Sequence, residues 1–231
     1  MAQTPFPKLL WGMVVLLLVL AGTMPAEAIT VHTTQVPTGG SSPPATDACD
    51  GFPCVPYELG MLFQSSTDGD ITAIRFWRAD SEPSADGSHV GRIWAADGSL
   101  LDSTSFTGET LGGGWQEQAL AAPLAILAGT TYTVSVNTLG HYVYTSQGLN
   151  AGITNGDLTA LAGAGLGGCV GSGTGNGRFA PPGTFPTSSF NCNDYFRDIQ
   201  FTPAAVPVPA AVWLFGSALG LMGVTRRKPA G

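Results

Sequence analysis

The sequence predicts one all-β domain, a single antiparallel β-sandwich. Between the two ends of the chain, seven short stretches alternate apolar and polar residues with a period of two, and no helical pattern occurs. Turn residues separate the stretches at intervals of about 8–12 residues, which is typical of a β-sandwich. A chain of 231 residues suffices for one such domain. The expected strands are Asp70–Arg78, Val90–Ala95, Leu100–Phe106, Trp115–Leu120, Thr130–Asn137, Tyr142–Thr145 and Tyr195–Thr202.

The connections inside this domain, residues 49–203, include one long glycine-rich stretch. Asp97-Gly98 lies between two expected strands and is a strong signal for a two-residue hairpin. Residues 148–178 hold 11 glycines among 31 residues and interrupt the period of two. Because loops of this length are uncommon and often functional, we expect a mobile loop here; an irregular extra hairpin is the alternative.

The N-terminus has the features of a secretory signal. Within residues 1–28, Lys8 precedes the apolar run Leu9–Leu20, and Ala26 and Ala28 form a small-residue cleavage site. The run is shorter than the ~20 residues that a membrane span needs. We therefore expect a signal helix that is removed on export, followed by a Ser/Thr/Pro/Gly-rich linker over residues 29–48.

Residues 204–231 have the features of a weak membrane anchor that an enzyme could remove. An apolar run over residues 210–224 ends in three basic residues, and its length is marginal for a stable membrane helix. The basic residues would hold that end on the cytoplasmic side, so we expect transient membrane contact. The motif consists of Val206, Pro207, Val208, Pro209, Ala210, Ala211, Arg226, Arg227 and Lys228.

This C-terminal motif resembles the PEP-CTERM class of bacterial sorting signals, in its VPxPA-type variant. Val208 differs from the name-giving motif, which has Glu between the two prolines. The resemblance implies the export machinery and an exosortase as partners, in Gram-negative bacteria that produce exopolysaccharide. It also implies an inner-membrane intermediate and then a location at the cell surface or outside the cell.

The charge distribution excludes several classes of function. The whole chain has 9 Lys and Arg against 16 Asp and Glu, a formal net charge of −7. Residues 29–203 keep five of the basic and 15 of the acidic residues, which gives −10. This acidity argues against a nucleic-acid partner. All five basic residues are Arg, and the absence of Lys excludes Schiff-base and P-loop lysine chemistry.

Several stretches of the domain resemble a bacterial family known as domain of unknown function 4082. The resemblance implies a jelly-roll-like antiparallel β-sandwich in an exported protein, and no established activity. The stretches are Tyr57–Phe63, Ile74–Trp77, His89–Leu101, Gly114–Glu117, Ala128–Tyr132, Phe185–Phe190 and Asn193–Phe201.

Four cysteines, an even number in an exported chain, predict two disulfides. Three pairings are possible. The pairing of Cys49 with Cys54 and of Cys169 with Cys192 needs the least rearrangement of the chain, and its second bond would close part of the glycine-rich region into a loop.

Two Arg-x-Trp motifs are the main candidate for a ligand-binding surface. In Arg75-Phe-Trp77 and in Arg92-Ile-Trp94 the period of two places the Trp on the same strand face as the Arg. If both strands lie in one sheet, the four side chains form a patch that stacks on sugar rings and binds their hydroxyls. In the alternative, both tryptophans belong to the core and each Arg packs its stem on an indole.

Other acidic residues suggest weaker alternatives. Calcium is the one cofactor that we consider, because carboxylate oxygens bind it and the expected domain is acidic and exported. Its candidate ligands are Asp68, Asp70, Asp194 and Asp198. A glycoside hydrolase would need two carboxyl groups beside a cleft, for which the candidates are Glu58, Glu109 and Glu117.

These observations favour a non-enzymatic binding module at the cell surface or in the extracellular matrix, with polysaccharide as its ligand. No catalytic motif occurs in the sequence. The first alternative is a secreted carbohydrate-active hydrolase, which predicts clustered carboxylates in a deep pocket. The second is a purely structural matrix protein, which predicts no concave site.

Overall fold

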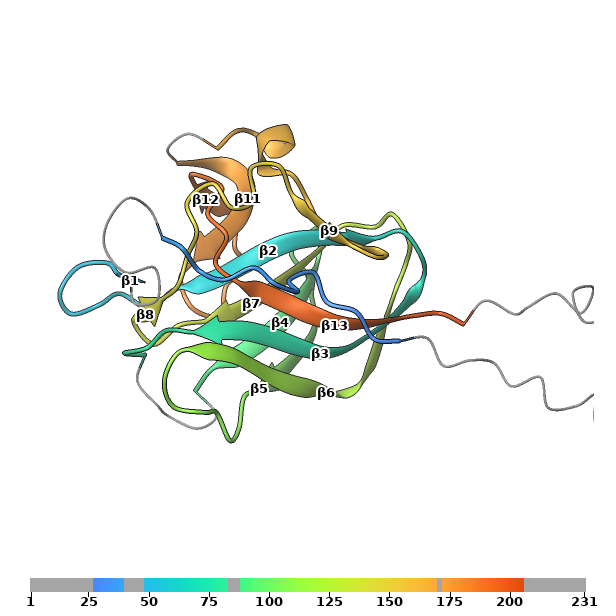
Figure 1. The fold of residues 1–231 in the computed structure, drawn as a ribbon, viewed down its shortest axis with the longest axis horizontal. Coiled ribbons are helices and arrows are strands. Elements are labelled where there is room, and N and C mark those ends of the chain that lie inside the picture. Colours follow the sequence, from blue (N-terminus) through green and yellow to red (C-terminus); the bar gives the residue numbers. More distant parts are fainter. Residues whose placement is uncertain (1–26, 40–47, 83–87, 170–171, 206–231) are drawn as a thin grey trace, which may run out of the picture. The chain divides into compact units, whose positions relative to one another are not determined.

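The computed structural model describes residues 27–39, 48–82, 88–169 and 172–205. Within this part, Glu27–Ala204 form one compact unit of antiparallel strands, which confirms the predicted all-β, sandwich-like class (Figure 1). The predicted signal and sorting helices, with Ala26 and residues 206–231, lie outside the described residues. Within those residues, no helix has the length and apolar character needed to cross a membrane.

The larger sheet of the described domain has eight strands. Their hydrogen-bonded order is β12-β11-β2-β7-β4-β5, and β10 pairs with both β2 and β9. All of the pairings are antiparallel. The strands are β2 (Glu58–Ser65), β4 (Val90–Ala95), β5 (Leu100–Ser105), β7 (Tyr132–Asn137), β9 (Ile153–Asn155), β10 (Leu158–Ala160), β11 (Ser172–Ala180) and β12 (Ser188–Phe190).

A second sheet faces the first and has the order β13-β3-β6 (Figure 1). Its strands are β3 (Gly69–Arg78), β6 (Gly114–Ile126) and β13 (Arg197–Pro203). A short pair at one end of the domain joins β1 (Ala48–Cys49) to β8 (His141–Tyr142). This short pair becomes one wall of the functional site described below.

The core lies between the two larger sheets. Ile74 and Phe76 of β3 meet Phe63 of β2, Ile93 of β4 and Val134 of β7 in one buried apolar cluster. Alternation along each strand places these residues on the inner face, as the period of two predicts. Full burial of one such side chain contributes about 1.5–3 kcal/mol.

Four of the expected strands are shorter than predicted, and for two of them the structure shows a local reason. The stretch Tyr142–Thr145 forms a ladder only at His141–Tyr142, and Thr145 makes isolated bridges to Gly39 and Asp194 instead. The last strand begins at Arg197 because Phe196 has a φ of 54°, which is incompatible with an extended strand.

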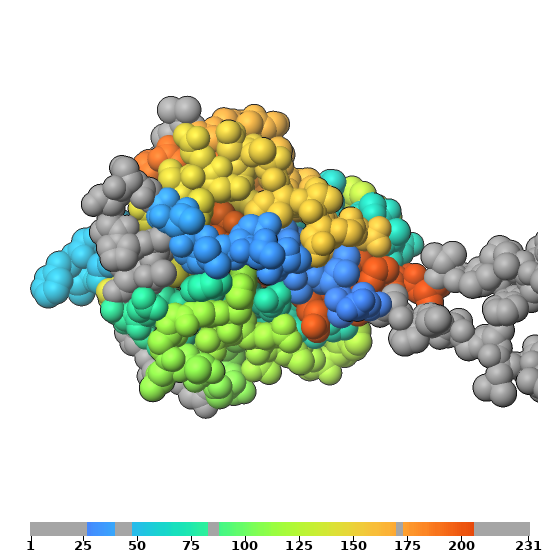
Figure 2. Space-filling view, in the orientation of Figure 1, coloured from blue at the N-terminus to red at the C-terminus, as the bar shows by residue number. Residues whose placement is uncertain are grey.

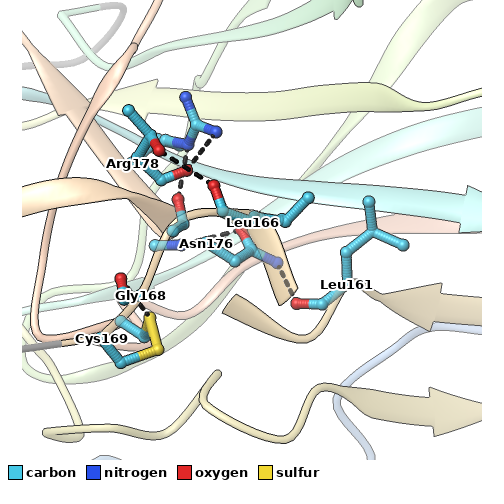
Figure 3. The surroundings of a disulfide bond; sticks show 10 residues. Leu161, Leu166, Gly168, Cys169, Asn176 and Arg178 are labelled. Atoms are coloured by element: carbon cyan, nitrogen blue, oxygen red, sulfur yellow. Dashed lines mark hydrogen bonds between the residues drawn. A yellow bond between two sulfur atoms is a disulfide. The ribbon is translucent and has the colours of Figure 1, made fainter. Parts of the chain in front are cut away.

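The glycine-rich stretch 148–178 was expected to be a mobile loop, and this expectation is wrong for its described residues. It contains the hairpin β9–β10, a short 3₁₀ helix η2 (Gly163–Leu166) and most of β11, so the alternative of an extra hairpin is the better description. Asn176, which is fully buried, holds this region in place. Its amide group bonds to the backbone of Leu62, Leu161 and Gly177 (Figure 3).

The N-terminal strap, defined as residues 27–39, is packed on the domain, whereas the sequence suggested a free linker from residue 29 onward. Ile29 exchanges two backbone hydrogen bonds with Phe201, and Val31 enters the core. In Figure 2 the strap crosses one face of the domain between the glycine-rich region and β6. The sequence did not predict that these residues pack on the domain, because the segment has no periodic pattern of apolar residues.

Candidate functional site

A cavity of about 510 Å³ opens beside the β1–β8 pair. Four of the five tyrosines of the chain line it, and we call it the tyrosine pocket. Cavities of about 300–1,000 Å³ with mainly aromatic walls and few polar groups are typical of small-molecule sites. The side chains used below are those of Asp50, Tyr57, Tyr142, Tyr144, Phe179, Phe190, Asn193 and Tyr195.

Tyr142 lies at the centre of the aromatic wall. Its ring centroid is 6.3 Å from that of Tyr57, 6.2 Å from that of Tyr144 and 5.9 Å from that of Tyr195. The rings of Tyr57 and Tyr195 stand nearly edge-on to it, at 86° and 75°. Such edge-to-face contacts are a favourable arrangement of aromatic rings.

Tyr142 and Tyr195 are neutral hydrogen-bonding groups over a wide pH range. Burial, and then the nearby Asp50 carboxylate, raise the pKa of Tyr142 well above its ordinary value. Burial raises the pKa of Tyr195 to about 12. The Tyr142 hydroxyl donates a hydrogen bond to Asp50 Oδ2 at 3.1 Å. Among the described residues, the wall therefore offers tyrosines and one carboxylate, and no Lys, Arg or His.

Asn193 supplies a buried acceptor on the pocket wall. Its residue is 7% exposed, and within the described part of the chain its Oδ1 atom has no hydrogen-bond partner. A buried polar atom without a partner costs about 1–3 kcal/mol. The oxygen is itself closed to solvent, so it is not a ligand contact in this conformation.

The disulfide Cys49–Cys54 positions one side of the pocket. It closes the short loop that carries Asp50, and β1 pairs Cys49 with His141 and Ala48 with Tyr142. The loop and the central tyrosine are therefore held together by a covalent bond and by backbone pairing.

The disulfide Cys169–Cys192 holds the loop whose residues Asn191 and Asn193 line the pocket. It is the second bond of the predicted pairing, the one that needs the least rearrangement of the chain. Cys192 and Asn191 both have positive φ, 47° and 53°, a conformation that non-glycine residues seldom adopt. A Cβ at Gly163 or at Gly175 would lie 2.4 or 2.6 Å from Cys192 Sγ, so only glycine fits there. The glycines of this region thus make room for the disulfide that fixes the pocket loop (Figure 3).

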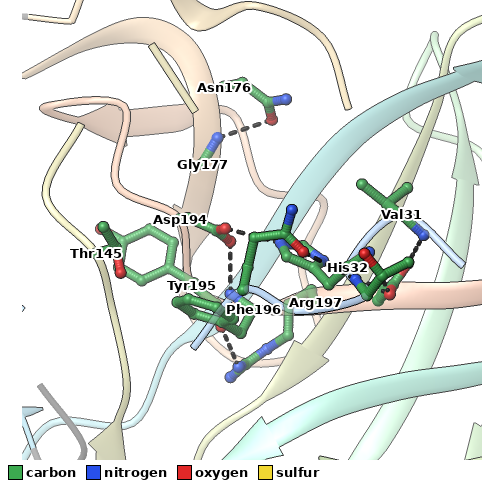
Figure 4. A network of polar contacts seen from close by, with 12 residues as sticks. Val31, His32, Thr145, Asn176, Gly177, Asp194, Tyr195, Phe196 and Arg197 are labelled. Carbon is green, nitrogen blue, oxygen red and sulfur yellow. Dashed lines mark hydrogen bonds and ion pairs between the residues drawn. The ribbon is translucent and has the colours of Figure 1, made fainter. Parts of the chain in front are cut away.

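The N-terminal strap reaches the same loop through His32. His32 Nε2 lies 2.7 Å from Asp194 Oδ2, and the Asp198 carboxylate accepts hydrogen bonds from the backbone N–H groups of Val31 and His32 (Figure 4). Burial alone would lower the pKa of His32, but the carboxylates of Asp194 and Asp198 raise it to about 10. His32 is therefore a buried cation at neutral pH.

The two Arg-x-Trp motifs do not form one patch, because β3 and β4 belong to different sheets. Arg75 lies over the ring of Trp115, 4.6 Å from its centroid, and pairs with Glu117. Trp77 packs against Trp115 and Phe196. The side chains of this first motif, which were predicted to stack on sugar rings, are therefore already in contact with other protein side chains.

The second motif is also engaged internally. Trp94 is 6% exposed, donates from Nε1 to Ser135 Oγ at 2.8 Å, and packs against Phe185. Arg92 pairs with the buried Glu58 at 2.8 Å. The alternative from the sequence, core tryptophans with each Arg packed on an indole, holds in part: Trp94 is buried, whereas Trp77 is half-buried and Arg75 lies over Trp115 instead.

The acidic candidates are dispersed. Asp194 and Asp198 are engaged by the strap, whereas Asp68 accepts from Ala128 N and Asp70 pairs with Thr202 at the far end of β13. Among the described residues, the one group of three or more possible metal ligands includes the disulfide-bonded Cys49 and Cys54, whose sulfurs are not thiolates.

The three glutamates considered for hydrolysis are also separate. Glu58 pairs with Arg92, Glu117 pairs with Arg75, and Glu109 contacts the buried His89 at 2.8 Å. None of the three lines the tyrosine pocket. The clustering that the hydrolase alternative requires is absent from the described structure.

The sequence contained one local signal for the pocket. Tyr142 and Tyr144 are two residues apart in an expected strand, which places both rings on one face. Tyr57, Phe179 and Tyr195 come from distant segments, so no local pattern groups them with that pair.

Fold and site define a class: a disulfide-bonded, antiparallel β-sandwich-like domain with a pocket walled by tyrosines. The model of the family described as domain of unknown function (DUF4082) matches residues 44–197, which is two thirds of the chain. The chain therefore belongs to this family, as the motifs of its strands had indicated. Neither the curated proteins nor the solved structures contain a match to it.

Proposed function

We propose that the protein is an exported surface or matrix protein whose sandwich domain binds polysaccharide without catalysis, through the tyrosine pocket. The observation that carries this proposal is the gathering of four tyrosines, Asp50 and Asn193 around one cavity. A sugar ring has an apolar face and a rim of hydroxyls. Aromatic rings beside neutral donors and acceptors match both features.

The carboxylate count favours binding over hydrolysis. Asp50 is the one carboxylate among the residues that line the pocket in the described structure. Glycosidases of the common retaining and inverting types use two carboxyl groups on either side of the scissile bond. A purely structural role, in turn, would not require a concave site with an aromatic wall.

Export supports the same assignment. The two disulfides are of the kind that forms in oxidising compartments, and the signal-like N-terminus and PEP-CTERM-like C-terminus fit export, an inner-membrane intermediate and exosortase processing. In this proposal the sandwich is jelly-roll-like and faces the exopolysaccharide outside the cell.

Deletion of residues 206–231 tests the sorting step: the truncated chain should leave the cell surface, and unchanged retention there would contradict processing through this tail.

Binding is tested with the full-length chain and immobilised polysaccharides. Phe190→Ala removes a side chain at the pocket rim that is 46% exposed, and Tyr142→Phe removes the central hydroxyl. We expect each to weaken binding about tenfold, as loss of an aromatic or buried polar contact commonly does.

Two matched variants are the controls. Leu127→Ala removes an exposed apolar side chain from the turn after β6, and Tyr132→Phe removes a hydroxyl that accepts from Leu127 N. Both should bind as the unchanged protein does. Equal effects in pocket and control variants, or no binding by any variant, would remove the proposal.

A further inference from the structure

We infer that the ligand is an electrically neutral polysaccharide, bound along its chain across two adjoining subsites. This inference rests on the proposed function and adds the charge class of the ligand and its mode of binding. The structural basis is a second cavity that shares a wall with the tyrosine pocket, together with the internal use of every arginine of the domain.

The second cavity has a volume of about 370 Å³. Tyr57 and Phe179 line it and the tyrosine pocket alike, so the two cavities adjoin at these two residues. The ring centroids are 6.0 Å apart and the planes meet at 81°. The shared aromatic pair is a ridge from which a polymer contacts both cavities.

The walls of the second cavity suit the apolar face of a sugar. Pro181 and Pro182 are exposed on one side and Val55 and Pro56 on another, with Thr187 and Ser188 supplying hydroxyls. None of its lining residues is Asp, Glu, Lys, Arg or His. A ligand that placed only its terminal sugar in the tyrosine pocket would leave this second, uncharged cavity empty. A polysaccharide chain that continues past Tyr57 would cover it.

The arginines of the domain are not available to an acidic ligand. In the part of the chain that the structure describes, neither cavity is lined by an arginine, and residues 29–203 contain no Lys. Arg178 donates to the backbone carbonyls of Thr174, Gly175 and Thr187. The other four have internal carboxylate or carbonyl partners: Arg75 with Glu117 and Asp198, Arg78 with Glu109, Arg92 with Glu58, and Arg197 with the carbonyl of Tyr195.

Charge selection follows from this arrangement. The pocket presents the Asp50 carboxylate, and the domain carries a formal net charge of −10 over residues 29–203. A uronic acid or sulfate group would enter a negative field without a cation to pair with, which is unfavourable. Neutral hydroxyls meet the phenol groups of the pocket at no such cost.

The experiment compares neutral with acidic glycans and short with long ones. The full-length protein is titrated calorimetrically with glucan oligosaccharides of increasing length, with mannan, and with alginate as the acidic polymer. We expect binding to neutral polymers, an affinity gain of about tenfold or more from disaccharide to hexasaccharide as the second subsite fills, and little change with added salt.

A variant isolates the second subsite. Thr187→Trp fills that cavity from an exposed position, and Ser103→Trp places the same side chain on the exposed edge of β5. Thr187→Trp should reduce hexasaccharide affinity to that of the disaccharide and leave the disaccharide unchanged, whereas Ser103→Trp should change neither.

The outcomes separate this inference from the proposed function. Binding of alginate that is lost in Phe190→Ala would keep the polysaccharide-binding function and overturn the neutral ligand. Neutral binding without length dependence would overturn the two-subsite mode. Absence of binding to every glycan would overturn both the function and this inference.

Discussion

His32 Nε2 lies 2.7 Å from Asp194 Oδ2, although 162 residues separate the two in sequence. Both residues are 2% exposed. Asp194 pairs through its backbone with Thr145, and its neighbours Asn193 and Tyr195 line the tyrosine pocket. The ion pair therefore joins the N-terminal strap to the pocket loop.

The free energy of unfolding should depend on pH through His32. Its pKa is about 10 in the folded chain against 6.5 as the ordinary value. The stabilisation is thus fully present below pH 6.5, falls by up to about 1.4 kcal/mol per pH unit above it, and is lost as the pH rises through 10. Urea unfolding at about pH 6, 7.5 and 9 measures this slope. A flat or rising profile over this range would contradict the buried cation.

The substitution His32→Gln should remove the part of the pH dependence of the unfolding free energy that comes from His32. It should also destabilise the domain. Asp194 then stays buried without its cationic partner, whereas Asp198 keeps Arg75, and we expect a loss of about 3 kcal/mol at pH 6. His89, whose pKa Glu109 and Glu82 raise against the lowering effect of burial, keeps a residual slope of the same sign. Thr34→Ala, an exposed change on the same strap, is the control. An unchanged slope in His32→Gln would assign the pH dependence elsewhere.

The two disulfides should differ in their contribution to stability. Cys169 and Cys192 are 23 residues apart, whereas Cys49 and Cys54 are five apart. Because a longer closed loop restricts the unfolded chain more, double replacement by Ala should cost about 3 kcal/mol for the first pair and about 2 for the second. Denaturant unfolding of the two double variants provides the comparison. A greater loss for the short loop would mean that native contacts, rather than loop entropy, dominate.

The strand pattern was predictable because it is local, whereas the sheet partners were not. Alternation placed Ile74 and Phe76 on the inner face correctly. β3 and β4 are consecutive in sequence, yet they lie in opposite sheets. Their assignment to different sheets separates Trp77 from Trp94, and it cannot be predicted from the residues of either strand alone.

The pocket was only partly predictable for the same reason. The disulfide partners followed from proximity along the chain, which is a local argument. The loop at Asn191 and Cys192 adopts positive φ without glycine, so its conformation depends on tertiary contacts that composition does not reveal. The glycines that suggested mobility instead allow close packing, as at Gly177, where a Cβ would lie 1.8 Å from Asn193 O.

Asn176→Ala should destabilise the glycine-rich region severely. The Asn176 amide accepts from Leu62 N and Gly177 N at 2.8 Å each, and donates to the carbonyls of Leu62 and Leu161. Loss of several buried hydrogen bonds predicts about 3 kcal/mol or more. Hydrogen exchange over residues 153–166 should accelerate with it.

Thr174→Ala is the control for Asn176→Ala. It removes one exposed hydrogen bond to the Leu166 carbonyl and should cost less than about 1 kcal/mol. If both variants unfold at the same denaturant concentration, the buried amide is not what orders this region.

Replacement of Arg92 should separate stability from polysaccharide binding. Arg92→Met removes the ion pair to Glu58, which is fully buried and also accepts hydrogen bonds from Ser135 Oγ and Gly183 N. A buried carboxylate that loses its cation predicts a loss of about 3 kcal/mol in unfolding free energy. Because Arg92 lines neither cavity, glycan affinity measured well below the unfolding temperature should be unchanged. The opposite result, normal stability with lost binding, would return the ligand to the Arg-x-Trp motif and away from the tyrosine pocket.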